Sequence, residues 1–424
     1  MVHTRIKILF LLEFMANLKT FLFISLDGMT DALGQSQVIP YLVGLSEKGN
    51  KIELVSCEKK ENWNLKHVEI ESILNKANIK WHYSFYKTGK PFVSQIQNYL
   101  ALKQIVLNRI KENSNNFVIH CRSYLPGLIG LSAKKKFNTG FIFDMRGFWA
   151  DEKTEGGIWK KSNPISLSIY SYFKKKEKEM LLDADAIISL THKAKSIILD
   201  WNIGIPSQKI TVIPCCVDLE HFSKEKLNTS HLSVITHKHP QLKDKFVLSY
   251  VGSLGTWYMA NEMMAFFKAL SEKTEAELLI ITKDSEALVQ KAAKKIGVPV
   301  NKITVVSSSR EDMPYYISLS TASIFFIKPT FSKLASSPTK MGELLSMEVP
   351  IITNEGIGDV SETIRDSNCG VIITDFNNNA YQKAVQEILE GKNQFLKNTL
   401  TTAKKYFSLA DGVEKYNYIY NLFK

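Results

Sequence analysis

Cysteine is scarce in this chain, and its spacing does not suit a structural role. The five cysteines among 424 residues are an odd number, and none has the spacing of a zinc site. Cys215 and Cys216 are adjacent, an arrangement that rarely suits a disulfide or a metal. We therefore expect reduced, buried thiols, as is typical of a cytoplasmic protein.

Long apolar runs, low-complexity tracts and internal repeats are also missing. Near the N-terminus, Arg5 and Lys7 precede an apolar run over Ile8–Met15 that Glu13 interrupts. A helix that crosses a bilayer takes ~20 residues, so this run is too short, and no cleavage site of a signal peptide follows it. Residues 1–14 are interpreted as an upstream start, with a short interfacial anchor as the alternative.

Negative charge is in deficit, and the deficit is local. The net charge is +12, and the first 210 residues contain 30 Lys and Arg against 19 Asp and Glu, whereas the rest contains 24 against 23. A one-sided positive field suits an anionic membrane surface, an anionic acceptor or a nucleic acid. No nucleic-acid-binding motif accompanies it, so we do not expect nucleic acid as a partner. A basic face that serves only solubility is the alternative.

Strand and helix signals alternate along the chain, which predicts parallel sheets covered by helices. The length favours two domains. Helices are expected at Ser36–Lys48, Tyr172–Leu182 and Asn261–Glu272, and the polar segment Lys224–Asp244 is interpreted as a loop or linker. Expected strands lie at Thr20–Leu26, Lys51–Ser56, Ile79–Phe85, Phe117–His120, Gly140–Asp144, Ala186–Leu190, Phe246–Val251, Glu277–Thr282, Lys302–Val306, Ala322–Ile327, Pro350–Thr353 and Gly370–Ile373.

This rhythm predicts an α/β protein of two Rossmann-like domains that face each other across a cleft. In such folds, ligands bind outside the carboxyl ends of the strands. The loops that follow the strands are therefore where the chemistry is expected.

Two loops of the first half follow apolar strands and carry candidate binding groups. Asp27–Gln37 contains Gly34 and Gln35 ahead of a helix, whose free N–H groups suit a phosphate. The loop lacks the Gly-x-Gly-x-x-Gly spacing, so an NAD-type site is not supported, and a turn without a ligand is the alternative. In the second loop, His120 suits a sugar hydroxyl and Arg122 an anion, although a strand-end histidine is more often structural.

A third loop, Phe143–Glu152, combines acidic, basic and aromatic groups within ten residues. Asp144 and Arg146 suit sugar hydroxyls, and Trp149 suits the C–H face of a sugar ring. A salt-bridged loop is the alternative, but a tryptophan exposed in a loop is costly without a partner. The loop is therefore expected to bind a sugar.

The corresponding loop of the second half is Val251–Tyr258. Its glycines, Gly252 and Gly255, allow the backbone to approach a ligand closely, and Ser253 and Thr256 can donate hydrogen bonds to phosphate oxygens.

The segment Lys333–Leu344 gives the most specific signal. Ser337 is expected to cap a helix that begins at Pro338. A helix N-terminus together with Lys340 suits a diphosphate. Glu343, about one turn further on, can accept hydrogen bonds from both ribose hydroxyls. The segment therefore predicts a nucleotide diphosphate site.

Five segments, in this order, resemble the group 1 (family 4) glycosyltransferases, which are retaining enzymes with the GT-B fold. They are GQSQVIPYLVGLSEKGNKIEL, FDMRGFWADE, TVIPCCVDLEHF, YVGSLGTWY and SSPTKMGELLSMEVPIITNEGIGD. The resemblance covers nearly everything from Lys19 to the C-terminus. It implies an acceptor-binding domain at residues 15–210 and a nucleotide-sugar-binding domain at 211–404, with a helix at about 405–424 that packs back on the first domain.

The resemblance also implies which residues form the site. His120 matches the family's histidine near the donor sugar, and Glu343 matches the second glutamate of its Glu-x7-Glu motif, which holds the ribose. With Lys340, these two form the expected catalytic group. Donor-binding residues are expected at Gly34, Gln35, Ser253, Gly255, Thr256, Arg310, Ser337, Pro338 and Thr339. Acceptor-binding residues are expected at Asp27, Arg122, Asp144, Arg146 and Trp149.

The sequence departs from the family pattern at two points. Ser253 and Thr256–Tyr258 stand where the family's diphosphate-binding arginine and lysine are usual, and Ala335 replaces the first glutamate of the motif. A desolvated diphosphate needs positive partners, so we expect Lys340, with Lys333, to supply them. An impaired enzyme is the alternative.

The reaction that the resemblance implies is retention at the anomeric carbon without an enzymic nucleophile, metal or cofactor. The leaving diphosphate helps to deprotonate the acceptor, and the protein positions and stabilises charge. The sequence has no Asp-x-Asp metal motif, since Asp183-Ala-Asp185 lies beside a helix end and is interpreted as structural.

The expected function is hexosyl transfer from an NDP-sugar, with a UDP-sugar favoured, to a glycan or lipid-linked acceptor in cell-surface polysaccharide synthesis. Basic and aromatic residues at Lys134–Lys136 and Tyr172–Lys176 favour an anionic membrane surface. The chain is therefore expected as a cytoplasmic, peripheral protein at the inner face of the plasma membrane. The alternatives are a catalytically impaired GT-B-fold partner subunit and another enzyme of the fold, such as a nucleotide-sugar epimerase.

Overall fold

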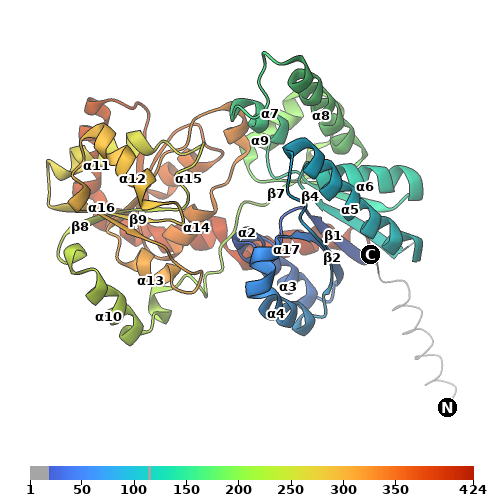
Figure 1. Cartoon of the computed structure of the whole chain (residues 1–424), viewed down its shortest axis with the longest axis horizontal. Helices are drawn as coiled ribbons and strands as arrows, with labels where there is room; N and C mark the ends of the chain where they lie inside the picture. The colour runs from blue at the N-terminus through green and yellow to red at the C-terminus, as the bar shows by residue number, and fades with distance from the viewer. Residues whose placement is uncertain (1–18, 113–115) are drawn as a thin grey trace.

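The computed structural model describes residues 19–112 and 116–424, and the interpretation of residues 1–14 lies outside these ranges. Two parallel sheets form two lobes side by side (Figure 1). The first has seven strands in the order β3-β2-β1-β4-β5-β6-β7, and the second has six in the order β10-β9-β8-β11-β12-β13. The expectation of two Rossmann-like domains is confirmed.

The first sheet contains β1 (Thr20–Ser25), β2 (Lys51–Glu58), β3 (Lys80–Phe85), β4 (Phe117–Arg122), β5 (Gly140–Asp144), β6 (Ala186–Ser189) and β7 (Ile210–Val212). Its helices are α2 (Ala32–Gln37), α3 (Ile39–Glu47), α4 (Lys60–Lys76), α5 (Pro91–Glu112), α6 (Tyr124–Phe137), α7 (Trp149–Glu155), α8 (Pro164–Asp183) and α9 (His192–Asp200). All six residues of β1 are buried, because helices cover both faces of the sheet.

The second sheet contains β8 (Phe246–Val251), β9 (Ala276–Ile281), β10 (Ile303–Val306), β11 (Ala322–Phe325), β12 (Ile351–Asn354) and β13 (Gly370–Ile373). The helices of this half are α10 (Thr229–Lys238), α11 (Ala260–Ser271), α12 (Glu286–Ile296), α13 (Met313–Ser318), α14 (Thr339–Ser346), α15 (Val360–Ser367) and α16 (Asn378–Phe407). Each domain has an extensive apolar core of its own.

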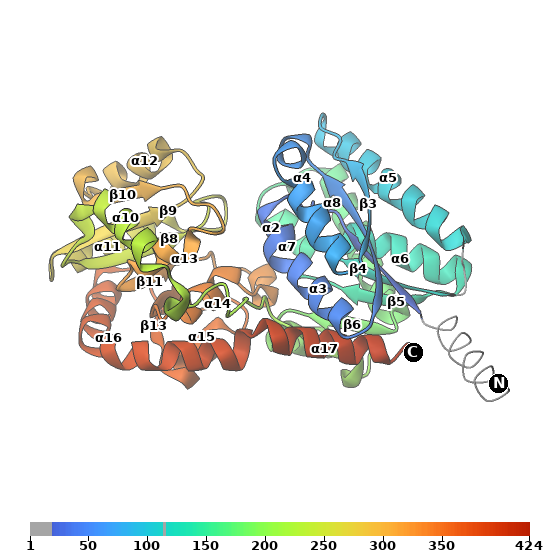
Figure 2. The ribbon, with the colours of Figure 1, turned by 90° about the horizontal axis from the view of Figure 1, so that it is seen from below.

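The last helix, α17 (Leu409–Asn421), leaves the second domain and packs on the first (Figure 2). It lies against α3, where Gly44 leaves room for the side chain of Val413. The ring of Tyr420 stacks on Phe21 of β1, with 3.7 Å between the ring centroids. The C-terminus therefore completes the core of the domain that the N-terminal half begins.

Two local expectations are wrong. The single helix expected at Ser36–Lys48 is two helices, α2 and α3, that separate at Val38. Pro40 has no N–H, and its ring conflicts with the carbonyl four residues earlier, so a continuous helix cannot form there. The linker expected at Lys224–Asp244 contains α10, which Asn228 caps by accepting from the backbone N–H of His231.

Candidate functional site

The loop between β11 and α14 of the second domain contacts α7 and α9 of the first domain through residues Phe331–Ala335. Ala335 in this loop joins the apolar core of the first domain. The ring of Phe331 stacks on Phe148, with 5.0 Å between centroids, and the N–H of Ser332 donates to Glu155 at 3.0 Å. The two domains are therefore in direct contact around the segment that the sequence singles out.

Lys340 lies on the first turn of α14 and is buried. Among the described residues, its Nζ has no hydrogen-bond partner. Burial lowers the pKa of Lys340 to about 7, although the charge of Glu343 opposes that shift. An unpartnered buried ammonium group at a helix N-terminus is suited to an anion that the protein does not itself supply.

Glu343 and Arg310 form the second part of this site. Burial raises the pKa of Glu343, and the charges of Arg310 and Lys340 act against the rise. Burial lowers the pKa of Arg310, which lies over the ring of Phe222 with 5.9 Å between Cζ and the ring centroid. Both cations act on the Glu343 carboxylate, so the structure brings three of the predicted donor-site residues together.

Lys333, the other lysine expected at the diphosphate, is already engaged. Its Nζ is 3.9 Å from the centroid of the Trp257 ring and 3.2 Å from Glu152 Oε1. Two lysines were expected to share the diphosphate. Of these two, only Lys340 lacks a hydrogen-bond partner among the described residues.

The start of α14 differs from the expected cap. The helix begins at Thr339, with Pro338 in the N-cap position and no side-chain cap hydrogen bond. The hydroxyl of Ser337 instead accepts from the backbone N–H of Cys215 at 3.1 Å. The expectation that Ser337 caps the helix is therefore wrong. Its hydroxyl oxygen instead accepts the hydrogen bond of a backbone N–H in the segment that connects the two domains.

The loop between β8 and α11 lies beside Lys340. Gly252 has a φ of +115°, and a Cβ there would be 3.0 Å from Lys340 Nζ. The Ser253 hydroxyl donates to the carboxylate of Asp284 and accepts from the N–H of Gly255 at 3.2 Å. Thr256 is exposed. The hydrogen bond to Asp284 thus occupies the Ser253 hydroxyl that the sequence assigned to phosphate.

The loop after β1 and the start of α2 are shaped by close backbone contact, and Gly34 and Gln35 lie within α2 rather than ahead of a helix. A Cβ on Gly34 would lie 2.2 Å from the carbonyl oxygen of Gly28, so only glycine fits. Gln35 donates to the carbonyl of Thr30 at 2.9 Å. Glu58, which the sequence analysis did not identify, accepts from the backbone of Met29 at 2.7 Å and fixes the loop. Gly34 gave a signal in the sequence, whereas the carboxylate at the end of the neighbouring strand β2 did not.

His120 lies within β4, not in the loop after it, and is fully buried. Its Nδ1 is 2.8 Å from the Tyr420 hydroxyl, and its Nε2 is 3.9 Å from Asp144 Oδ2. Burial lowers the pKa of His120 to about 4. Asp144 also accepts from the Tyr416 hydroxyl at 3.0 Å. The structure therefore places His120 and Asp144 beneath α17, and their expected sugar contacts stay predictions.

The other predicted acceptor residues lie at the strand ends of the first domain. Asp27 is partly exposed and lies 3.5 Å from Nε of the buried Arg122. Arg146 has a φ of +58° and donates to Cys215 Sγ at 3.2 Å. Burial alone would lower the pKa of Arg146, but the charge of Asp144 raises it overall.

Trp149 is the first residue of α7 and is packed rather than exposed in a loop. Its ring contacts Phe173 and Trp159, at 4.8 and 5.2 Å between centroids, and lies near Tyr124. The sequence analysis expected a sugar ring to be the partner of Trp149. In the structure, other aromatic rings of the first domain pack against it.

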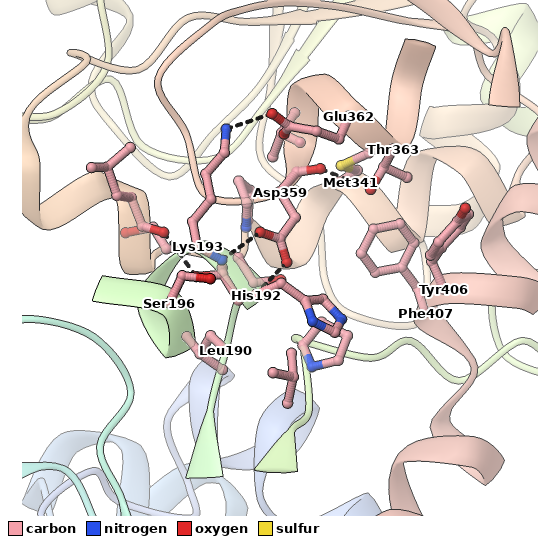
Figure 3. A pocket seen from close by; sticks show the side chains of 18 of the residues that line it. Leu190, His192, Lys193, Ser196, Met341, Asp359, Glu362, Thr363, Tyr406 and Phe407 are labelled. Atoms are coloured by element: carbon pink, nitrogen blue, oxygen red, sulfur yellow. Dashed lines mark hydrogen bonds and ion pairs between the residues drawn. The ribbon is translucent and has the colours of Figure 1, made fainter. Parts of the chain in front are cut away.

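A cavity of 580 Å³ lies between the domains on the side of α9 and α15 (Figure 3). Asp359 of the second domain accepts from the backbone N–H groups of His192 and Lys193, at 2.6 and 3.1 Å. Met341 of α14 lines this cavity, whereas Lys340 and Glu343 do not. Asp359, to which the sequence analysis gave no role, therefore serves as a cap for α9 across the domain boundary.

No set of three metal-ligating side chains occurs in the part of the chain that the structure describes. Within the same residues, no helix is long and apolar enough to cross a membrane. Asp185 accepts from Lys134 and from the backbone N–H of Phe141, which agrees with its interpretation as structural.

Several solved structures share the whole fold. A glycosyltransferase from Rickettsia africae has 18% identity and a TM-score of 0.68, covering 96% of this chain and 99% of that one. HepE of Anabaena, solved with UDP and glucose, has 10% identity and a TM-score of 0.66, covering 95% and 99%. A sucrose-phosphate synthase from Thermosynechococcus elongatus has 15% identity and a TM-score of 0.69, covering 95% and 98%.

Two family models match consecutive parts of the sequence. The model described as Glycosyltransferase Family 4 matches residues 43–221, and the model described as Glycosyl transferases group 1 matches residues 234–406. A search among curated proteins gave no match. The chain belongs to the group 1 (family 4) glycosyltransferases, GT-B-fold enzymes that transfer a sugar from a nucleotide diphosphate sugar.

Proposed function

We propose that this chain is a retaining, metal-independent hexosyltransferase that uses a UDP-sugar and glycosylates a glycan or lipid-linked acceptor in cell-surface polysaccharide synthesis. The observation that carries the proposal is the buried Lys340 ammonium group beside Glu343 on α14, which has no hydrogen-bond partner among the residues that the structure describes. UDP is favoured as the nucleotide because HepE, which shares this fold, was solved with UDP and with UDP-glucose.

The proposed donor site divides the donor among three side chains. Lys340 pairs with the diphosphate, Glu343 accepts hydrogen bonds from the ribose, and Arg310 lies at the base. As the sugar–oxygen bond breaks, negative charge develops on the leaving diphosphate, and Lys340 stabilises it. The acceptor oxygen forms the new bond to the anomeric carbon, and its proton passes to the departing phosphate, so the protein supplies neither the nucleophile nor the base.

The proposed acceptor side is the strand-end surface of the first domain, including Asp27 and Arg122. His120 and Asp144 are proposed to act beneath this surface, through their hydrogen bonds to α17. The leading alternative, an impaired partner subunit, predicts that no donor binds or reacts.

The experiment that tests the donor site is thermal stabilisation by a panel of nucleoside diphosphates. UDP is expected to raise the melting temperature of the wild type, and Glu343→Ala is expected to lose most of that shift. Glu390→Ala, an exposed glutamate on α16, is the matched control and is expected to keep it. Release of UDP from a UDP-sugar then distinguishes an active enzyme from a binding protein. No shift with any nucleotide contradicts the proposal.

Binding to an anionic membrane is part of the proposal, but the lysines that suggested it are partly neutralised. Lys134 pairs with Asp185, and Lys135 and Lys176 both contact Glu179, at 2.8 to 3.2 Å. Co-sedimentation with vesicles of neutral lipid, with and without anionic phosphatidylglycerol, measures this part. Equal recovery with both kinds of vesicle contradicts electrostatic attachment.

A further inference from the structure

The Lys340 ammonium group is held by aromatic ring faces rather than by hydrogen bonds. Its Nζ is 3.9 Å from the centroid of the Tyr258 ring, 4.4 Å from that of Tyr250 and 5.9 Å from that of Phe325. The residue is only 8% exposed, and within the described residues Nζ has no hydrogen-bond partner. Among the groups in direct contact with Nζ, the ring faces are therefore the ones that stabilise its positive charge.

Ring faces compensate for only part of the cost of burying an ammonium group. Burial accordingly lowers the pKa of Lys340 to about 7. Glu343, on the same helix, is the charged group that favours the ammonium form, while the charge of Arg310 favours the ionised form of Glu343. Burial raises the pKa of both Tyr250 and Tyr258, so these rings carry no charge near neutral pH.

The two rings are fixed at opposite ends of the loop between β8 and α11. The Tyr250 hydroxyl donates to the backbone carbonyl of Ser253. The N–H of Tyr258 donates to the carbonyl of Gly255 at 3.0 Å, and Tyr258 pairs with Ile327 in an isolated antiparallel bridge. The ring positions are thus set by the backbone of this loop.

The backbone of the same loop also leaves room for the ammonium group. Gly252 adopts a φ of +115°, which L side chains rarely adopt, and a Cβ there would come within 3.0 Å of Lys340 Nζ. Gly252 therefore permits the conformation of this loop and also leaves space for the Lys340 ammonium group.

We propose that Tyr250 and Tyr258 are positioning residues for the sugar donor: their ring faces hold the Lys340 ammonium group at the loop after β8, where it meets the diphosphate. This inference rests on the proposed function. The bound diphosphate adds an anion in direct contact with the ammonium group, besides the more remote charge of Glu343. Above neutral pH, donor binding then draws one proton from solvent onto Lys340.

The test compares Tyr258→Phe, which keeps the ring face, with Tyr258→Leu, which keeps only apolar volume. The dissociation constant for UDP is measured by calorimetry between pH 6 and pH 9, in buffers of different ionisation enthalpy. Wild type and Tyr258→Phe are expected to bind alike and to weaken together above pH 7, with proton uptake. Tyr258→Leu is expected to bind roughly tenfold more weakly at pH 8 and to begin weakening at a lower pH.

Melting temperatures without ligand show whether each variant is folded. Tyr258 is the better site for the substitution because it is only half-buried, whereas Tyr250 is 1% exposed. Should Tyr258→Leu not fold, Tyr250→Phe and Tyr250→Leu give a second matched pair.

Two results would overturn the inference while leaving the proposed function intact. One is UDP binding by Tyr258→Leu with the affinity and pH profile of the wild type, and the other is an equal loss in Tyr258→Phe. A wild type that binds no nucleoside diphosphate at any pH contradicts the proposed function itself, and the role given to the rings fails with it.

Discussion

His120 illustrates how one side chain can depend on an element 300 residues away. It is fully buried between Phe23 and Tyr416, and its Nδ1 meets the Tyr420 hydroxyl. Burial lowers its pKa to about 4, so the imidazole is neutral at physiological pH. A neutral imidazole can orient a hydroxyl but carries no charge to stabilise a phosphate.

The low pKa of His120 predicts a loss of stability in mild acid. In the unfolded chain a histidine takes up a proton near pH 6.5, whereas the folded protein resists protonation down to about pH 4. The free energy of unfolding should therefore fall by about 2 kcal/mol from this residue alone as the pH drops from 7 to 5. Urea unfolding at both pH values, compared with His120→Asn, measures the difference. Parallel losses in the two proteins would exclude this cause.

Lys340 is expected to contribute directly to the affinity for the donor. Replacing it with alanine removes a charge-assisted contact to the diphosphate, so the dissociation constant for UDP should rise about 10- to 100-fold. Lys397→Ala, an exposed lysine on α16, controls for the change in net charge. Isothermal titration calorimetry measures both variants, and an unchanged constant for Lys340→Ala removes its assigned role.

The loop between β8 and α11 gives a matched pair of glycines at the scale of one element. Gly252 has a positive φ and no space for a Cβ beside Lys340, whereas a Cβ on Gly255 would meet only Ser253 Oγ, at 3.4 Å. Gly252→Ala is expected to lower stability by about 1–3 kcal/mol and to weaken UDP binding. Gly255→Ala is expected to change both little. Thermal melting with and without UDP checks the pair, and similar behaviour of the two variants contradicts the argument.

Elements that bury one continuous apolar run were predictable from the sequence. β8 and β13 occupy the residues expected, because a parallel strand covered on both faces reads as an uninterrupted apolar segment. α10 was missed because Ile235 is its one fully buried residue, and so its sequence has no apolar stripe. The local pattern of apolar residues predicts a helix or strand only where that element buries a whole face.

The donor site was predictable in part for a related reason. Lys340 and Glu343 lie one turn apart on a single helix, so their spacing alone places them together. The two rings nearest Lys340, those of Tyr250 and Tyr258, come from β8 and the loop after it, about 80 to 90 residues earlier in the chain. No local spacing connects them to α14, and the same holds for the α17 tyrosines that cover His120. Contacts between elements that are distant in the sequence could therefore not be predicted from the sequence pattern.

At the scale of the whole molecule, the domains are joined by polar contacts as well as by the chain. Asp359 caps α9 of the opposite domain, and Lys193 pairs with Glu362 at 2.8 Å (Figure 3). A carboxylate at a helix N-terminus contributes about 1 kcal/mol. These contacts therefore favour the observed arrangement of the two domains by only a small free energy.

Removing the cap should loosen the two domains. Asp359→Ala is expected to raise the radius of gyration measured by small-angle X-ray scattering in the absence of donor. Asp366→Ala, which lines the same cavity without capping a helix, is the control. A radius for Asp359→Ala that matches the wild type would show that the apolar contacts of the β11–α14 loop hold the domains together without the cap.

The contribution of α17 to the first domain is also measurable. Tyr420→Phe removes the hydroxyl that meets His120 Nδ1, and should lower the free energy of unfolding by about 1 kcal/mol. Tyr418→Phe changes an exposed ring of the same helix and should have little effect. Urea unfolding compares the two, and equal stability would mean that the His120 contact contributes nothing net.

Because the C-terminal helix fills the core of the N-terminal domain, the order of synthesis and the order of completion differ. The seven-stranded sheet leaves the ribosome first, and domains generally fold in that order. Here the face of β1 and β4 that bears Phe21 and His120 stays uncovered until α17 is made. Synthesis must therefore pass the end of α17 before the first domain is whole, and a chain cut short within that helix releases a domain with an open core.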